Sequence, residues 1–270
     1  MHDRVSVNAL CFMGSPFREL TGYWRELGAH RVSLMTSTIF DEGLPAAQAA
    51  LATGDYKMET LSHQFLAGHL EPREETWRDP RERLSRVIDW AKTIGARSIY
   101  MVTGGHGTLT WEEAAKCFSA AVAPCVAHAK EAGVPLLIEC SPAVNAHSNI
   151  AHNLRDAVTA AEMAGIGVCA DLYACWTEAG LRETIERAIP RCSLVQVGDY
   201  VYGDRSLPAR AVPGDGAIPI KRLCDWLLRA GYKGTFDLEL LGPRIDNEGR
   251  VAAVGRAAKN LGEILQSLGV

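Results

Sequence analysis

The sequence predicts a single-domain (β/α)8 TIM barrel that spans residues 1–270. Short apolar segments alternate with amphipathic segments along the whole chain, and uninterrupted alternation is typical of parallel strands joined by helices. Eight such units fit a chain of this length, since these barrels need about 250 residues. Several expected helices end in a glycine just before the next strand, as at Gly95, Gly133, Gly165 and Gly231. Glycine there favours a helix C-cap.

The first four units follow this order from the N-terminus. The expected strands lie at 5–12, 31–36, 58–65 and 96–104. The expected helices lie at 17–28, 44–54, 80–95 and 111–133. A doubly wound open sheet is the alternative fold, but no G-x-G-x-x-G motif follows the first strand, which favours the barrel.

The last four units repeat the pattern. Their strands are expected at 134–140, 166–173, 192–199 and 234–241. Their helices are expected at 148–165, 178–190, 218–231 and 251–269. No low-complexity segment or linker interrupts the chain, which again predicts a single domain.

Composition excludes several classes of partner. The net charge is −4 and no basic run occurs, so we expect no nucleic acid partner. No apolar run approaches the ~20 residues that a membrane-spanning helix needs, and the N-terminus does not resemble a secretion signal. The eight cysteines form no C-x-x-C pair. We therefore expect reduced, buried thiols in a cytoplasmic protein that acts on a small molecule.

Oxygen-bearing side chains end each of the last four expected strands. They are Glu139 in LLIEC, Asp171 in VCADLY, Gln196 in LVQVGD and Glu239 in FDLELLG. Each alone could be a satisfied buried polar group: Asp171 could cap the helix that follows it, and Glu139 could pair with a lysine. Active sites of such barrels lie at the carboxyl ends of the strands, so we expect these side chains to share one mouth.

Three carboxylates at one mouth repel one another, and a divalent cation removes that repulsion. All four candidate ligands offer oxygen, counting Gln196 through its carbonyl, and oxygen suits hard cations. The sequence therefore predicts one divalent ion, Mn²⁺ or Mg²⁺, with Co²⁺ as a further candidate and Zn²⁺ less favoured.

The stretches LLIEC, CADLY, LVQVGD, RAVPGDGAIPIKRL and GYKGTFDLELLG resemble the xylose-isomerase-like TIM-barrel superfamily (sugar phosphate isomerases and epimerases, AP endonuclease 2-like). The resemblance is firmest over residues 134–241, and the PGDG segment at 213–216 is among its most specific parts. It implies metal ligands of the types Glu, Asp, His and Glu, which fall on Glu139, Asp171, Gln196 and Glu239. Gln196 thus stands where the family usually has histidine. Some dehydroshikimate dehydratases resemble this chain in having glutamine as the third ligand.

The resemblance also implies a reaction. We expect a metal-dependent isomerase or epimerase of a small polyhydroxylated keto substrate, which removes a proton next to a carbonyl through a metal-stabilised enediolate. Glu139 is the expected base and Glu239 its partner acid. A cation lowers the pKa of a carboxylate that binds it, so His106 in the loop TGGHG is an alternative base. The family often has a substrate-binding histidine where this chain has Ala174.

Four further residues are expected to bind substrate: His63, Trp176, Arg205 and Arg210. His63 ends the third expected strand, and the apolar surroundings of Trp176 suit a cyclic or apolar substrate face. The arginines, with Arg244, could hold a carboxylate or phosphate.

Alternatives remain open at this point. A metal-dependent lyase or dehydratase of the 3-dehydroshikimate or inosose dehydratase type would use the same residues, as would β-elimination from a keto-glycoside. A non-catalytic sugar-binding barrel is a third reading. Endonuclease activity is disfavoured by the net charge and by glutamine at position 196. The protein could form a homo-oligomer, a dimer or a tetramer.

Overall fold

The computed structural model describes residues 1–270, and the predicted fold class is confirmed. Eight strands form a closed barrel in chain order, with helices around it. The strands are β1 (Val5–Asn8), β2 (Arg31–Met35), β3 (Lys57–Gln64), β4 (Ile99–Val102), β5 (Leu136–Glu139), β6 (Gly167–Asp171), β7 (Cys192–Val197) and β8 (Thr235–Leu238). The neighbouring strands pair in parallel, as in β4–β5 and β7–β8.

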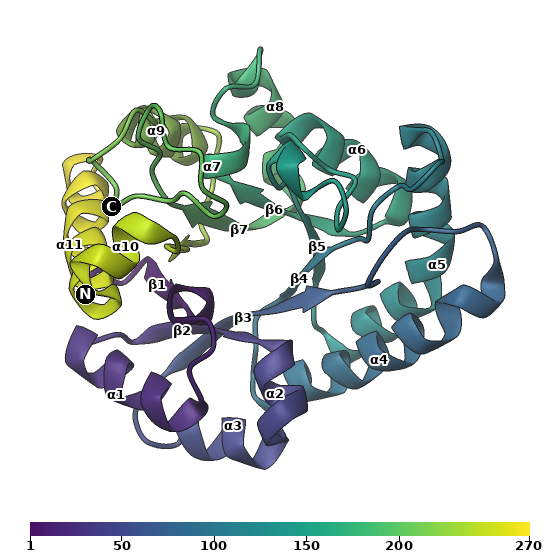
Figure 1. The fold of residues 1–270 in the computed structure, drawn as a ribbon, viewed down its shortest axis with the longest axis horizontal. Coiled ribbons are helices and arrows are strands. Elements are labelled where there is room, and N and C mark those ends of the chain that lie inside the picture. Colours follow the sequence, from purple (N-terminus) through teal and green to yellow (C-terminus); the bar gives the residue numbers. More distant parts are fainter. The chain divides into compact units, whose positions relative to one another are not determined.

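The chain divides into two compact units, and the first comprises Met1–Glu59 and Leu194–Val270. In this unit α11 packs against β1 and β8 and lies beside α1 and α10 (Figure 1). Its helices are η1 (Ala9–Phe12), α1 (Phe17–Leu27), α2 (Thr36–Glu42), α3 (Leu44–Leu51), α9 (Ile220–Arg229), α10 (Pro243–Glu248) and α11 (Arg250–Ser267).

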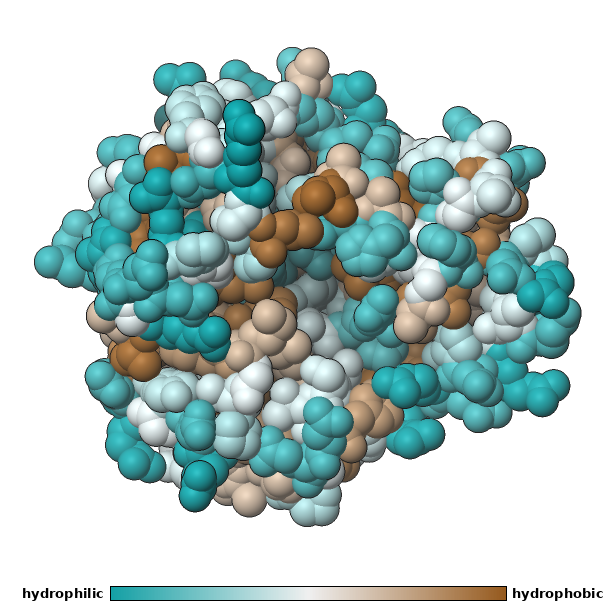
Figure 2. Space-filling model, viewed as in Figure 1, coloured by the Kyte–Doolittle hydropathy of each residue, from teal (hydrophilic) through white to brown (hydrophobic).

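The second unit comprises Thr60–Ser193. Here α4, α5 and α6 lie side by side, outside β4 and β5 (Figure 1). Figure 2 shows mainly hydrophilic residues on the outer surface over α4 and α5, which is the amphipathic pattern of helices that cover a sheet. The helices are η2 (Glu74–Trp77), α4 (Arg78–Thr93), α5 (Trp111–Ala132), η3 (Ala143–Asn145), α6 (Leu154–Ala164), α7 (Leu172–Cys175), α8 (Leu181–Ala188) and η4 (Ile189–Arg191).

Local capping explains where several elements begin and end. Thr110 and Glu113 form a reciprocal capping box at the start of α5, which satisfies backbone N–H groups that the first turn leaves without a partner. Gly133 ends α5 in the left-handed conformation, with φ 74°. The glycines expected to act as helix C-caps at positions 133 and 165 do so.

Most expected strands and several expected helices were too long, and capping explains two of these differences. The first strand ends at Asn8 rather than at residue 12, because the Asn8 side chain accepts the Leu10 N–H at 3.0 Å and starts the turn η1. The sixth helix begins at Leu154 rather than at residue 148, because Asn153 caps it by accepting the Asp156 N–H at 2.8 Å. The short helices α2, α7 and α10 were not expected.

All eight cysteines are free thiols, and seven of them are buried. This agrees with the expectation of unpaired, buried cysteines. None of the helices has the length and apolar character that a membrane crossing requires.

Candidate metal and substrate site

The carboxylate of Glu239 follows directly after β8 and is bracketed by two donors. Gln196 on β7 donates its Nε2 hydrogen to Oε2 of Glu239 through a short hydrogen bond. The Arg210 guanidinium lies 2.9 Å from Oε1 of the same carboxylate. All three side chains are buried. Since the Gln196 nitrogen points to Glu239, its carbonyl oxygen, the atom that can bind a cation, lies on the other side of the amide.

Strand register explains why Gln196 and Glu239 meet. Gln196 on β7 pairs with Asp237 on β8, and Glu239 lies two residues further along. Side chains two residues apart on a strand share a face. Glu239 therefore projects to the same face of the β7–β8 pair as Gln196, nearer the carboxyl end.

The same relationship recurs between β5 and β6 in the second unit. Glu139 pairs with Cys169, and Asp171 lies two residues beyond Cys169. Glu139 and Asp171 therefore share a face at the carboxyl ends of their strands. Both side chains are buried. Asp171 also caps α7, because its Oδ1 accepts the Tyr173 N–H at 3.0 Å. The capping role was one of the alternatives considered for this aspartate.

A buried asparagine, which was not predicted from the sequence, holds the end of β5 in place. Asn149 is fully buried. Its Nδ2 donates to the carbonyl oxygen of Glu139 and to Oγ of Ser141, each at 2.9 Å. Its Oδ1 accepts from the Thr103 hydroxyl at 3.1 Å. Asn149 thereby joins the loops after β4 and β5. No local pattern distinguishes it from an ordinary loop asparagine.

The two histidines predicted near the site differ in their surroundings. His63 on β3 is buried, and burial, reinforced by the charge of Arg83, lowers its pKa to about 4. His63 is therefore neutral at pH 7. His106 is half-buried, with Nδ1 3.0 Å from the Leu109 carbonyl oxygen. A carbonyl only accepts, so Nδ1 carries the hydrogen and Nε2 of the neutral ring keeps its lone pair.

The structure separates the two predicted loop arginines. Arg210 is buried against Glu239, whereas Arg205 is exposed in the same loop. Trp176 is half-buried at the end of α7. Arg244 pairs with Asp204 on the surface, through Nη2 at 2.9 Å from Oδ1.

A second buried carboxylate, that of Asp237, lies on β8 two residues before Glu239. Asp237 accepts hydrogen bonds from Ser6 at 2.5 Å, Asn8 at 2.7 Å and Ser33 at 2.9 Å. Burial raises the pKa of Asp237 to about 6, and these three hydrogen bonds act against the rise. This polar cluster was not predicted from the sequence, because Ser6, Asn8 and Ser33 each lie between apolar residues of the chain.

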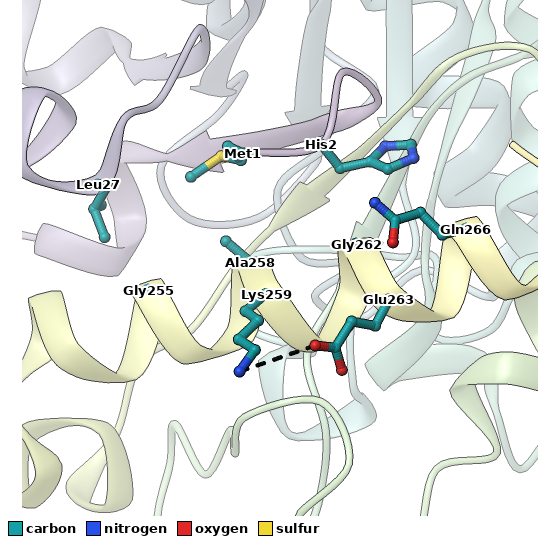
Figure 3. A pocket seen from close by; sticks show the side chains of 9 residues that line it. All are labelled: Met1, His2, Leu27, Gly255, Ala258, Lys259, Gly262, Glu263 and Gln266. Atoms are coloured by element: carbon teal, nitrogen blue, oxygen red, sulfur yellow. Dashed lines mark ion pairs between the residues drawn. The ribbon is translucent and has the colours of Figure 1, made fainter.

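A cavity elsewhere in the first unit contains none of the predicted site residues. It has a volume of about 520 Å³ and lies between the N-terminus and α11. Figure 3 shows Met1 and His2 on one side of it and Lys259 paired with Glu263 on the other. The cavity has no cluster of carboxylates or histidines, so it does not compete with the strand ends as a site for metal chemistry.

The donor set at the strand ends fits a hard divalent cation. Glu239 and Gln196 from the first unit, and Glu139 and Asp171 from the second, offer only carboxylate and amide oxygen. Each carboxylate has about four lone-pair positions, so the donors to Glu239 leave it able to bind an ion as well. The chain has no group of three or more His, Cys, Asp or Glu side chains that is already arranged to hold a metal ion.

Solved structures with the same fold include two sugar 3-epimerases and a zinc-binding protein. An IOLI protein with a bound zinc atom has a TM-score of 0.82 at 16% identity, over 98% of this chain and 99% of that one. An L-ribulose 3-epimerase has a TM-score of 0.81 at 17% identity, over 98% and 95%. A D-allulose 3-epimerase from Methylomonas sp. has a TM-score of 0.81 at 13% identity, over 97% and 98%.

No curated protein sequence is significantly similar to this chain. The model of one protein family, the xylose isomerase-like TIM barrel, matches residues 24–263. That match covers most of the barrel and includes all nine predicted site positions, from His63 to Glu239. The chain therefore belongs to the xylose isomerase-like TIM barrel family.

Proposed function

We propose that this protein is a divalent-metal-dependent isomerase or epimerase of a small polyhydroxylated keto substrate. One observation carries the proposal: the buried Glu239 carboxylate at the end of β8 contacts both Gln196, an oxygen ligand by type, and Arg210, a cation suited to a substrate oxygen. Buried charged groups held together in this way are typical of functional sites.

Four side chains would hold the ion: Glu139, Asp171, Gln196 and Glu239. They end four consecutive strands of a closed parallel barrel, and the carboxyl ends of barrel strands converge on one mouth. Mn²⁺ or Mg²⁺ suits an all-oxygen set best, with Co²⁺ as a further candidate. When bound, the ion would supply Lewis-acid polarisation of the substrate carbonyl.

Proton transfer would fall to the protein's own side chains. Glu139 would take the proton from the carbon next to the carbonyl, and Glu239 would return one as the partner acid. Arg210, which contacts Glu239, would orient a substrate oxygen. His106 is the alternative base, because its Nε2 carries a lone pair while Nδ1 donates to Leu109.

The remaining predicted residues would shape the substrate pocket. His63 is neutral at pH 7 because of its lowered pKa, so it would contribute a hydrogen bond and not a charge. Trp176 would offer an apolar face to a sugar ring, and the exposed Arg205 would contact only a substrate group that extends to the surface of its loop.

The named neighbours support this reaction class. They include an L-ribulose 3-epimerase and a D-allulose 3-epimerase, both of which by name act on ketoses, and an IOLI protein with bound zinc. A small-molecule substrate follows from the same likeness. The free cysteines suit a reducing compartment such as the cytoplasm. The protein would assemble as a homodimer or homotetramer.

A lyase is the second candidate, and Gln196 favours it. Glutamine at this position resembles some dehydroshikimate dehydratases. A neutral amide in place of an imidazole keeps the ligand set entirely oxygen. Loss of a β-hydroxyl after proton abstraction would then replace reprotonation.

Incubation in D₂O tests the proposal. The protein, loaded with Mn²⁺, is given D-fructose, L-ribulose and D-allulose in separate reactions that are followed by proton NMR. Solvent deuterium in a recovered isomer supports the isomerase or epimerase, and release of water supports the lyase. Glu139→Gln should abolish exchange, while the exposed Glu131→Gln on α5 should not. Exchange that persists in Glu139→Gln would contradict the assigned base.

A further inference from the structure

The loop between β7 and α9 is folded around one buried carboxylate, that of Asp199. Oδ1 accepts the backbone N–H groups of Tyr200 at 2.8 Å and Ile218 at 3.0 Å. Oδ2 accepts those of Gly214 at 2.9 Å and Gly216 at 3.0 Å. Asp199 is fully buried. Its carboxylate thus holds both ends of the loop together, and a carboxylate that accepts several N–H groups makes strong hydrogen bonds.

This arrangement explains the PGDG motif at 213–216. A Cβ atom at Gly216 would lie 2.7 Å from Cγ of Asp199 and closer still to the carbonyl oxygen of Tyr200. Gly214 has φ +100°, a conformation that other residues rarely adopt. The two glycines let the backbone approach the carboxylate closely enough for their N–H groups to reach it.

Arg210 lies inside the loop that Asp199 closes. The backbone groups of Asp199 and Ala211 exchange two hydrogen bonds, at 2.9 and 2.8 Å. The Arg210 N–H donates to the Leu241 carbonyl oxygen at 3.1 Å. The residue next to Arg210 is therefore tied to Asp199, and this places the guanidinium against Glu239.

Two ion pairs also hold the loop at the surface. Asp204 pairs with Arg244, and Asp215 pairs with Arg256 at 2.7 Å. Ion pairs that are this exposed contribute little, because solvent screens them. The buried Asp199, which accepts four backbone N–H groups, is therefore a stronger determinant of the loop conformation than these ion pairs.

We propose that Asp199 is a positioning residue that holds Arg210 against Glu239 by folding the loop 199–218. Its effect on metal binding and chemistry rests on the function proposed above, whereas its effect on the loop does not. Asp199→Asn tests the effect on the loop directly, because the new NH₂ group replaces one oxygen and faces two backbone N–H donors. Those two hydrogen bonds are lost and the donors repel.

Two measurements test the proposal. Hydrogen–deuterium exchange by mass spectrometry reports the loop, and Mn²⁺ calorimetry reports Glu239. In Asp199→Asn, peptides from 209–218 should exchange at least about tenfold faster, while peptides of α4 and α5 exchange as in the wild type. Mn²⁺ should bind about fivefold more tightly to Asp199→Asn and to Arg210→Met than to the wild type. In both variants the positive charge of Arg210 no longer competes with the ion for the Glu239 carboxylate.

The double variant Asp199→Asn/Arg210→Met tests whether Asp199 affects Mn²⁺ binding through Arg210. It should bind Mn²⁺ no more tightly than Arg210→Met alone, because both changes remove the same contact. The control Asp204→Asn, which loses only a surface pair on this loop, should match the wild type in both measurements. Gly216→Ala replaces Asp199→Asn if the latter does not fold, and it should loosen the same peptides.

Unchanged exchange over 209–218 would overturn the proposal, as would tighter Mn²⁺ binding in the double variant than in Arg210→Met. Absence of Mn²⁺ binding by the wild-type protein would instead overturn the proposed function. The exchange measurement would then decide the role of Asp199 by itself.

Discussion

The guanidinium of Arg210 lies 2.9 Å from Oε1 of Glu239, and both side chains are buried. Removing one partner of a buried ion pair leaves the other charge without compensation, which typically costs about 3 kcal/mol or more. Arg210 is therefore expected to stabilise the fold as well as to serve the proposed reaction.

Arg210→Met should lower the free energy of unfolding by about 3 kcal/mol, measured by urea denaturation at pH 7. Arg205→Met is the matched control, because Arg205 is exposed in the same loop. It should change the stability by less than about 0.5 kcal/mol. Equal effects of the two substitutions would show that burial of the Arg210–Glu239 pair does not contribute to stability.

Gln196→Leu should weaken Mn²⁺ binding by at least about tenfold while the protein stays folded, because leucine fills similar space but offers no oxygen. Calorimetry measures the affinity, and circular dichroism monitors the fold. Gln266→Leu, on the exposed face of α11, should bind Mn²⁺ as the wild type does. Unchanged affinity in Gln196→Leu would remove Gln196 from the ligand set.

Asp237 should make the protein less stable as the pH rises. Its folded-state pKa of about 6 lies above the ordinary value of 3.8, so the folded state holds the proton more tightly. The stability of the wild type relative to Asp237→Asn should therefore fall by about 2 kcal/mol between pH 4 and pH 7. Urea unfolding of both proteins across this range measures the difference. A difference that does not vary with pH would contradict the raised pKa.

His63 should make the protein less stable as the pH falls. Its folded-state pKa of about 4 lies below the ordinary value of 6.5, so the unfolded state binds the proton more tightly. The stability of the wild type relative to His63→Gln should fall by about 3 kcal/mol as the pH drops from 6.5 towards 4. Thermal or urea unfolding at several pH values tests this. Parallel pH profiles of the two proteins would mean that His63 titrates normally.

The sequence predicted the barrel because hydrophobic periodicity and glycine caps are local signals. The position of Glu139 at the end of β5 and that of Asp171 at the end of β6 were predicted for the same reason. The first strand was predicted too long, since the Asn8 cap that ends it is not visible in an apolar pattern.

The contacts of the site could not be predicted in the same way. The sequence offered Arg205 and Arg210 equally, and only the folded loop buries Arg210 and exposes Arg205. Asp199 and Asn149 were missed because each acts through hydrogen bonds to backbone groups that come together only in the folded chain. The Gln196 amide was predicted to present its oxygen, and the structure adds that its nitrogen binds Glu239.

Calorimetric titration of Mn²⁺ into the wild type and Glu239→Gln tests the central claim most directly. Glu263→Gln, an exposed carboxylate on α11, serves as the control. We predict one Mn²⁺ per chain in the wild type and in Glu263→Gln, and binding at least about tenfold weaker in Glu239→Gln. Absence of Mn²⁺ binding in the wild type, or equal binding in all three proteins, would contradict the account of a divalent-metal site at the ends of the barrel strands.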